Sequence, residues 1–597
     1  MKASPQMRPG RPSSRKSSFI SRLDPDPIGR DVAVSHDAIF ETLKKYPRLV
    51  TITSMMLALF SALCLYTLVA AQACTSPGNK TDWTWEKIPP SRKLQWYRCF
   101  GDEGLQCARL DLPMDWQDPS DGLRVVLAVV RKPATDTTDY RGPIIVNPGG
   151  TGGSGISYLR NFGTYAQSVV GTNYDLISFD PRGIGSSTPR YSCFNSEEER
   201  ASWELQDPGI VDTYPDLSLA GTIYARAQAL GRLCEQNVKA TGLVEHSGTT
   251  YIARDMLAIV DQTGFKDLAY WGFSYGTVIG NVFASMFPER VGKMLSDGNV
   301  DTEEWMTQKG RFFLTDAQAN MEAFYGYCHA AGADLCSFYE PSPEAIESKL
   351  GGLLKTLKVQ PIIIAASDAE NGPSIPKLVS YSDLQRFISA MLYQPYFEWP
   401  IFADILTGLN KGDGRPYYNY YNPVAAPSPI CGTEDVSPFD PLTYQVYQTP
   451  DAYPFMVCSD KPTLYNSTLE EAIEYAKFLI DWSPATGAFN WGESLRCAGR
   501  TARPKWRFEG PYGGKTKNPI LYINNKADPI SPLISARNNA ARFPGSVVLE
   551  QDSYGHTFLA APSNCSTKYI YEYFQDGTLP KNGTVCESLW EPFRRYE

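Results

Sequence analysis

The chain has 597 residues, of which 43% are hydrophobic and 20% are charged. This composition is typical of a globular protein with a large core and excludes a wholly disordered chain. The formal net charge of −9 argues against nucleic acid as the main partner, because chains that bind nucleic acid carry an excess of positive charge.

The N-terminal end differs from the rest of the chain. Residues 1–48 are rich in Pro, Ser and Arg and lack apolar periodicity, so we expect a disordered basic tail. The uncharged run 49–71 is long enough to cross a bilayer as a helix. Basic residues directly precede this run and none follows until Lys80, which predicts a signal-anchor with a cytosolic N-terminus and a luminal or extracellular remainder. The alternative is a secreted protein whose signal is cleaved near Ala73.

The positions of the cysteines and of the glycosylation sequons agree with a luminal or extracellular location for the residues after 71. Four N-x-[ST] sequons, the candidate glycosylation sites, are Asn79, Asn466, Asn564 and Asn582. Disulfides persist in oxidising compartments, and the later cysteines suggest local pairs. The pairs are Cys99 with Cys107, Cys193 with Cys234, Cys328 with Cys336, Cys458 with Cys497, and Cys565 with Cys586. Connectivity is not fixed by sequence, Cys74 and Cys431 have no assigned partner, and buried free thiols in a cytosolic protein are the alternative.

Between residues 75 and 301, short apolar runs alternate with helical patterns after a Trp-rich lead-in. The expected strands are 123–131, 142–147, 174–179, 268–271 and 291–295, and the expected helices are 156–170, 217–239, 249–263 and 277–287. This alternation predicts an α/β protein with a mostly parallel sheet and crossover helices on both faces.

The alternation stops over residues 302–516. This region has helical patterns separated by Pro- and Tyr-rich loops such as 415–423, so we interpret it as a mainly helical lid inserted into the sheet domain. Strands and helices alternate again over 517–597. We therefore expect 75–301 and 517–597 to be two parts of one core. The strands of the second part are expected at 519–524 and 546–550, and its helices at 533–543 and 566–575.

A G-x-S-x-G pattern, Gly272-Phe-Ser-Tyr-Gly276, lies between an expected strand and an expected helix. This is the setting of a nucleophile elbow, in which the serine occupies a sharp turn above the sheet. The glycines let neighbouring backbone approach, and the helix N-terminus favours developing negative charge. The pattern predicts Ser274 as a nucleophile.

A nucleophilic serine needs a base, and the chain has only four histidines. His556 follows the last strand, where the order Ser, acid, His of this elbow class places the base. The other three lie in the tail (His36), before the elbow (His246) and in the insertion (His329).

The acid of the triad is expected after the penultimate strand. Asp528 lies there, in a turn fixed by Pro529, and its carboxylate would hold the imidazole in the right tautomer. Asp297 is the alternative acid, whereas Asp552 is too close to His556 along the loop to be preferred.

The oxyanion hole is expected at the Gly-rich turn 148–155 and at the residue after the nucleophile. We predict the amides of Gly150 and Tyr275 as the donors. The turn lacks the lysine of a P-loop and the G-x-G-x-x-G pattern, which argues against a nucleotide site. The predicted acyl chemistry requires no metal and no organic cofactor.

Three motifs resemble those of the tripeptidyl aminopeptidase branch of the α/β-hydrolases, the proline-iminopeptidase-like serine peptidase family: Asn147-Pro-Gly-Gly-Thr-Gly-Gly-Ser-Gly155, Phe179-Asp-Pro-Arg-Gly-Ile-Gly185 and Tyr270-Trp-Gly-Phe-Ser-Tyr-Gly-Thr277. The tail from Cys458 to Cys586 is similar to the C-terminal domain of that branch, with motifs at 527–532, 554–557 and 573–580. The resemblance covers roughly residues 85–590.

This resemblance implies an α/β-hydrolase fold and exopeptidase action, under a helical cap, on peptides with a free N-terminus. It carries the catalytic triad onto Ser274, Asp528 and His556. The chain departs from the family at Thr151, where a second proline is usual, and at Thr557, where cysteine is commoner. Neither departure removes a reactive group. A membrane anchor is not typical of the secreted bacterial members.

Two other functions stay open: a hydrolase of the same fold that acts on esters or lactones, and a non-catalytic adhesion protein. The expected partners are a peptide with a free N-terminus (or a small ester) and a membrane through 49–71, without nucleic acid. A peptide N-terminus is a cation, so Glu303, Glu304 and Glu398 are candidates to bind it. A solvated acidic face is the alternative reading of each.

Overall fold

The structure is a computed structural model that describes residues 83–101, 104–211, 217–307, 310, 312–366, 373, 375–425, 437–441, 447–461 and 467–594. The predicted tail and the apolar run 49–71 lie outside these residues, as do Cys64, Cys74, Cys431, Asn79 and Asn466. Within the described ranges, no helix has both the length and the apolar character that crossing a bilayer requires.

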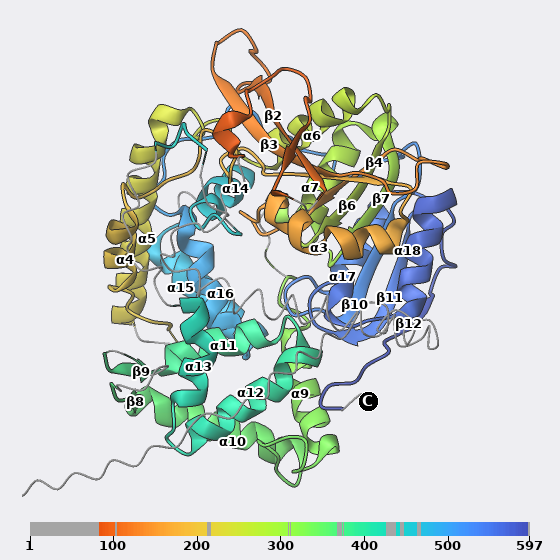
Figure 1. Cartoon of the computed structure of the whole chain (residues 1–597). Helices are drawn as coiled ribbons and strands as arrows, with labels where there is room; N and C mark the ends of the chain where they lie inside the picture. Colours follow the sequence, from red (N-terminus) through yellow and green to blue (C-terminus); the bar gives the residue numbers. More distant parts are fainter. Residues whose placement is uncertain are drawn as a thin grey trace, which may run out of the picture. The chain divides into compact units, whose positions relative to one another are not determined.

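A ten-stranded sheet forms the centre of the fold (Figure 1). Its order is β1-β2-β3-β5-β4-β6-β7-β10-β11-β12. Neighbours are parallel from β5 to β12 and antiparallel from β1 to β5, so the predicted mostly parallel sheet is confirmed. The strands are β1 (Tyr97–Cys99), β2 (Leu105–Pro113), β3 (Arg124–Lys132), β4 (Pro143–Asn147), β5 (Asp175–Phe179), β6 (Leu268–Phe273), β7 (Val291–Asp297), β10 (Leu521–Ala527), β11 (Val547–Tyr554) and β12 (Val585–Glu587).

Helices cover both faces of the sheet, which explains the continuous apolar runs of the central strands. In β4, Ile144 and Val146 pack on one face, in the same apolar cluster as residues of α3 and α18. Ile145 points to the other face and belongs to the cluster with α6, α7 and α17. The bounds are α3 (Gly155–Val170), α6 (Thr249–Thr263), α7 (Tyr275–Met286), α17 (Leu533–Arg542) and α18 (Asn564–Asp576).

Strands β1 and β2 lie in the Trp-rich lead-in, where the sequence had indicated no strand. They extend the sheet at its antiparallel end, and β2 pairs with β3 from Gln106 to Pro113. The polar residues Arg109 and Asp111 interrupt the apolar pattern of β2, so its strand signal is weak. Arg109 is nevertheless buried, with its guanidinium donating to the carbonyl of Ile88 (3.3 Å).

The region 302–516 is mostly helical where the structure describes it, with one short antiparallel strand pair, β8–β9. Part of it forms an apolar cluster of its own, in which Phe324, Phe387, Trp399 and Phe402 are buried. The elements are α8 (Thr302–Thr307), α9 (Ala317–Ala331), α10 (Pro343–Val359), β8 (Ile362–Ile364), β9 (Lys377–Val379), α11 (Tyr381–Met391), α12 (Pro395–Asn410), α13 (Arg415–Ala425), α14 (Ala452–Asp460), α15 (Leu469–Trp482) and α16 (Gly487–Ser494).

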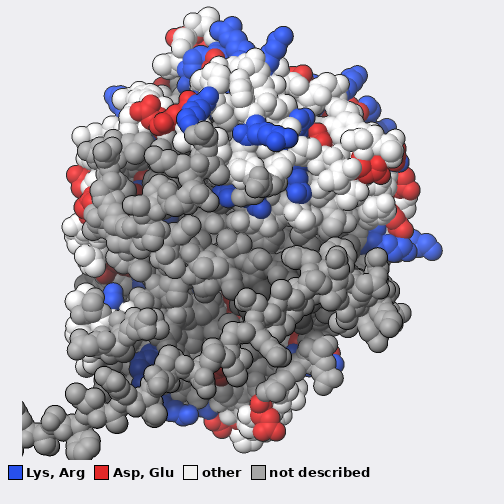
Figure 2. All heavy atoms as spheres, viewed as in Figure 1, with Lys and Arg blue, Asp and Glu red and all other residues white. Residues whose placement is uncertain are grey.

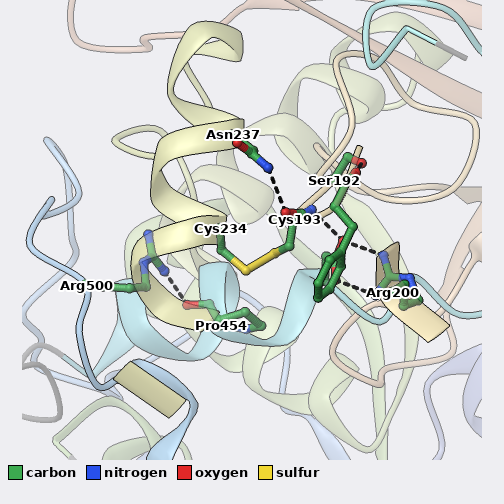
Figure 3. Close-up of a disulfide and its surroundings, with 9 residues drawn as sticks. Ser192, Cys193, Arg200, Cys234, Asn237, Pro454 and Arg500 are labelled. Atoms are coloured by element: carbon green, nitrogen blue, oxygen red, sulfur yellow. Dashed lines mark hydrogen bonds and ion pairs between the residues drawn. A yellow bond between two sulfur atoms is a disulfide. The ribbon is translucent and has the colours of Figure 1, made fainter. Parts of the chain in front are cut away.

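Asp451, just before α14, connects this region to the sheet domain. Its carboxylate accepts hydrogen bonds from the backbone amide of Cys193 (2.7 Å) and from both terminal nitrogens of Arg200 in α4 (Glu197–Glu204). Figure 3 shows the adjoining disulfide, which joins Cys193 to Cys234 in α5 (Leu217–Val238), and Asn237, which donates to the carbonyl of Cys193 (2.9 Å).

All five cysteine pairs that the sequence suggested are disulfides in the structure. They are Cys99–Cys107, Cys193–Cys234, Cys328–Cys336, Cys458–Cys497 and Cys565–Cys586. This number of disulfides indicates an oxidising compartment, as for an extracellular or secreted protein. The sequon residues Asn564 and Asn582 are both exposed. On the visible part of the surface, basic and acidic side chains are mixed (Figure 2).

Candidate active site

Ser274 occupies the sharp turn between β6 and α7. Its backbone has φ 54° and ψ −124°, a conformation that non-glycine residues rarely adopt. The amide of Ser274 donates to the carbonyl of Asp297 at the end of β7 (2.9 Å), and its own carbonyl accepts from the amide of Thr277 (2.8 Å). The predicted strand–turn–helix setting of the serine is present.

The two glycines of the pattern lie where there is no room for a side chain. A Cβ atom added to Gly272 would lie 2.6 Å from the carbonyl oxygen of Gly276. A Cβ atom added to Gly276 would lie 2.8 Å from the carbonyl oxygen of Asn147 at the end of β4. Both contacts are shorter than real Cβ atoms make, so only glycine lets the turn close against β4.

The Gly-rich loop, residues 148–155, passes close to Ser274. A Cβ atom on Gly149 would lie 3.0 Å from the Cβ of Ser274 and 3.0 Å from the amide nitrogen of Tyr275. Gly150, the predicted donor, is the next residue, with φ +116°. Tyr275 is the first residue of α7, so its amide has no partner within the helix. The predicted oxyanion donors therefore belong to segments that meet at Ser274.

Two polar side chains that the sequence analysis did not single out position this loop. Asn147 accepts a hydrogen bond from the amide of Gly149 (2.9 Å). Asp180 accepts from the hydroxyl of Ser154 (2.7 Å) and from the amide of Ser186 (2.8 Å). Burial raises the pKa of Asp180 to about 6, against the effect of these donors. The signal for Asp180 was present in the Asp-Pro-Arg-Gly motif after β5.

His556 and Asp528 form the predicted pair. Nδ1 of His556 lies 2.9 Å and 3.0 Å from the two carboxylate oxygens of Asp528, and 3.1 Å from the hydroxyl of Ser531. Asp528 is fully buried and accepts three backbone amides, those of Ile530, Ser531 and Thr557. The carboxylate is therefore fixed in place, and it holds the hydrogen of the imidazole on Nδ1.

The alternative acids occupy other environments. Asp297 is fully buried, one of its carboxylate oxygens accepts from the amide of Phe558 (2.9 Å), and burial raises its pKa to about 8. It is therefore mostly neutral at pH 7, which does not suit the acid of a triad. Asp552 is half exposed and pairs with Lys526 (3.1 Å). Of the candidates, only Asp528 bonds His556.

The ring of His556 lies beside the strand end that holds the serine. A Cβ atom on Gly298 would lie 3.3 Å from Cε1 of His556. Gly298 directly follows Asp297, whose carbonyl accepts from the amide of Ser274. Ser274 and His556 thus both lie beside the C-terminal end of β7.

The region 302–516 contacts the site from two directions. Just before α12, the carbonyl of Tyr393 accepts from the amide of His556 (2.9 Å), and the rings of these two residues lie edge to face at 5.1 Å. Before α14, the side chain of Gln448 donates to the carbonyl of Thr151 (2.7 Å), and the amide of Thr449 donates to the carbonyl of Gly152 (2.9 Å). Both the histidine loop and the Gly-rich loop are therefore packed against this region.

Two family models match the chain. The α/β hydrolase fold family matches residues 142–333, which include the Gly-rich loop and Ser274. The TAP-like protein family matches residues 483–586, which include Asp528 and His556. The chain belongs to the TAP-like α/β-hydrolases.

Curated relatives of this TAP-like α/β-hydrolase extend the similarity beyond the matched regions. Serine protease Hip1 of Mycobacterium tuberculosis is 26% identical over 89% of this chain and 98% of its own length. Tripeptidyl aminopeptidase of Streptomyces coelicolor is 35% identical over 35% of this chain and 38% of its own length. Carboxylesterase B of Mycobacterium tuberculosis is 25% identical over 81% of this chain and 86% of its own length. The TAP-like chain is a serine hydrolase.

Proposed function

We propose that this protein is a serine exopeptidase that cleaves peptides near a free N-terminus. The observation that carries the proposal is the buried Asp528 bonded to His556, next to the strained turn of Ser274. The similarity to a serine protease over nearly the full length of both chains favours peptides as substrates.

The proposed mechanism uses this geometry directly. Asp528 keeps the hydrogen of His556 on Nδ1, so Nε2 is free to take the proton of Ser274 as the hydroxyl attacks the peptide carbonyl. The amides of Gly150 and Tyr275 stabilise the oxyanion. His556 then protonates the leaving amine, and water, activated by the same imidazole, hydrolyses the acyl-enzyme.

Glu398 is the acidic residue that best fits a substrate ammonium group. Of the three glutamates considered from sequence, Glu303 pairs with Arg542 (2.9 Å), and Glu304 accepts from the amide of Phe312 (2.7 Å). One carboxylate oxygen of Glu398 is buried without a hydrogen-bond partner among the described residues. Burial raises the pKa of Glu398 to about 8, and an ammonium group bound beside it would favour the ionised form again. Glu398 lies in the first turn of α12, the helix whose start packs on the histidine loop.

We further propose that residues 302–516 act as the lid and that 49–71 anchors the protein with its catalytic part outside the cytosol. The contacts of Tyr393 and Gln448 with the catalytic loops support the lid. The disulfides support a location of the catalytic part outside the cytosol. Alkaline carbonate extraction tests the anchor: the full chain should stay with membranes, and a variant without residues 1–73 should be released.

Esterase activity is the second candidate function, because a carboxylesterase is also similar to most of the chain. Acyl chemistry at Ser274 serves both reactions. The substrate class therefore depends on groups that recognise the peptide amine.

A substrate panel separates these functions. We expect chromogenic peptides with a free N-terminus to be cleaved with a higher kcat/KM than their N-acetylated forms, and Ser274→Ala to abolish both reactions. Glu398→Gln should raise KM for free peptides at least 10-fold without changing cleavage of acetylated ones, whereas Glu303→Gln should change neither. Hydrolysis of simple esters without cleavage of free peptides would refute the peptidase proposal.

A further inference from the structure

Three potential metal ligands meet outside the proposed catalytic residues. Asp115 and Asp121 lie in the loop that joins β2 to β3, and His246 lies just before α6. One ligand atom from each residue lies within 4.8 Å of the others. The loop is closed by a hydrogen bond from the amide of Met114 to the carbonyl of Leu123 (3.0 Å), which brings the two aspartates to the same end of the sheet.

His246 provides the observation that points to a ligand. Its side chain is almost fully buried, and Nδ1 lies 2.7 Å from the carbonyl oxygen of Gly242, so Nδ1 carries the hydrogen. Nε2 is therefore an unprotonated acceptor in the neutral ring, and it is buried without a hydrogen-bond partner among the described residues. It lies 3.4 Å from a carboxylate oxygen of Asp115. Either a proton on Nε2 or a bound cation relieves the repulsion between these two atoms.

The two carboxylates are oriented for such a cation. One oxygen of Asp115 accepts from the amide of Gln117 (2.8 Å), and one oxygen of Asp121 accepts from the amide of Leu123 (2.9 Å). Each carboxylate is thus held by backbone and keeps an oxygen for a ligand. A proton on Nε2 of His246 would give a hydrogen bond to Asp115 but none to Asp121. A divalent ion would be bound by all three side chains.

Arg182 holds the walls of this site together. Its guanidinium donates to the carbonyls of Met114 and His246, both at 2.9 Å. It also forms a fully buried ion pair with Asp255 (2.7 Å), which in turn accepts from the indole of Trp116 (2.7 Å). The backbone on both sides of the three ligands is therefore fixed before any ion binds.

We propose that Asp115, Asp121 and His246 bind one divalent cation of the zinc class. An imidazole with two carboxylates suits Zn²⁺ better than Ca²⁺, which prefers six to eight oxygen ligands. A tetrahedral zinc with bonds of about 2.0 Å places its ligand atoms about 3.3 Å apart, close to the 3.4 Å between His246 and Asp115. The hydrogen bond from Nδ1 to a backbone carbonyl is the usual support of a ligating histidine. The fourth position is open to water. The ion joins the β2–β3 loop to the segment before α6.

The test uses the tag-free full chain in detergent, stripped with a chelator and titrated with zinc chloride. We expect one high-affinity Zn²⁺ per chain and a rise in thermal midpoint on binding. Asp121→Asn, at an exposed position, should weaken zinc binding at least 10-fold, and His246→Gln should abolish it. Asp118→Asn is the matched control, because Asp118 lies in the same loop but bonds Ser120. It should leave binding unchanged.

Three results would overturn the assignment. The first is the absence of bound zinc in the folded wild-type chain. The second is zinc binding that Asp121→Asn leaves unchanged. The third is tighter binding of calcium than of zinc in parallel titrations.

Discussion

At the scale of single residues, environment separates two buried aspartates that both lie near the proposed base. Asp528 accepts three backbone amides and bonds His556, and these contacts hold its carboxylate in place. Asp297 has a pKa raised to about 8 by burial and bonds one amide. The sequence placed both after strands and favoured Asp528 from chain order, which does not show how many donors surround a carboxylate.

Replacing the orienting acid should damage catalysis without unfolding the protein. Asp528→Asn is expected to lower kcat by about 10⁴-fold with little change in KM, because the amide favours the wrong tautomer of His556. Steady-state kinetics on a cleaved peptide measure the effect. Asp552→Asn, in the strand before the histidine, should keep wild-type kinetics, and a similar loss in both variants would contradict the assignment of the acid.

The buried Asp297 should make stability depend on pH. Its pKa is about 8 in the folded state and about 3.9 in the unfolded state. Neutral Asp297 therefore contributes to the free energy of unfolding. Its contribution is fully present below pH 4 and is lost as pH rises to 8, by at most about 1.4 kcal/mol per pH unit. Asp297→Asn should remove this slope in denaturant titrations at several pH values. Parallel stability curves for the two proteins would show that Asp297 ionises normally.

At the scale of elements, the sequence predicted those strands and helices that have a continuous hydrophobic pattern. The central strands match within a few residues, because strands buried on both faces are uninterrupted apolar runs. The sequence did not reveal β2, whose apolar pattern is interrupted by Arg109 and Asp111, or β12, which has three residues. The Gly-rich loop was predicted from composition, but its supports required the structure: Asn147 bonds the amide of Gly149, and Asp180, after β5, bonds Ser154 at the start of α3.

The Gly-rich loop should tolerate no side chain next to the serine. Gly149→Ala would place Cβ 2.3 Å from the carbonyl oxygen of Phe273, so we expect the loop to shift and kcat to fall by about 10²-fold or more. Gly264→Ala is the matched control, because Gly264 has a similar φ (+83° against +86°) and open space around it. The left-handed backbone should cost both variants about 1–2 kcal/mol of stability. Gly149→Ala should lose more because of the clash, and only Gly149→Ala should lose activity.

At the scale of the whole molecule, the site is assembled by contacts between residues far apart in the chain. Such contacts cannot be predicted from local sequence patterns. The region 302–516 was recognised as an interruption, yet its contacts through Tyr393 and Gln448 required the structure. His246 was set aside from sequence because it precedes the elbow. Folding places it beside Asp115, more than a hundred residues earlier in the chain, which no local pattern shows.

A disulfide that closes a longer loop should stabilise the molecule more, in step with the logarithm of the loop length. Replacing Cys193 and Cys234 by alanine opens a separation of 41 residues and is expected to cost about 4 kcal/mol. The same change at Cys99 and Cys107, separated by 8 residues, should cost about 2.5 kcal/mol. Denaturant unfolding of both double variants measures the difference, and an equal or reversed order would contradict the loop-entropy account.

Covalent labelling of the nucleophile tests the catalytic assignment most directly. The folded protein is treated with a fluorophosphonate, digested and mapped by mass spectrometry. We predict one stoichiometric adduct on Ser274 that disappears in His556→Ala, although Ser274 is still present in that variant. An unlabelled Ser274 in the folded wild-type protein, or an adduct on another serine, would contradict the proposed triad.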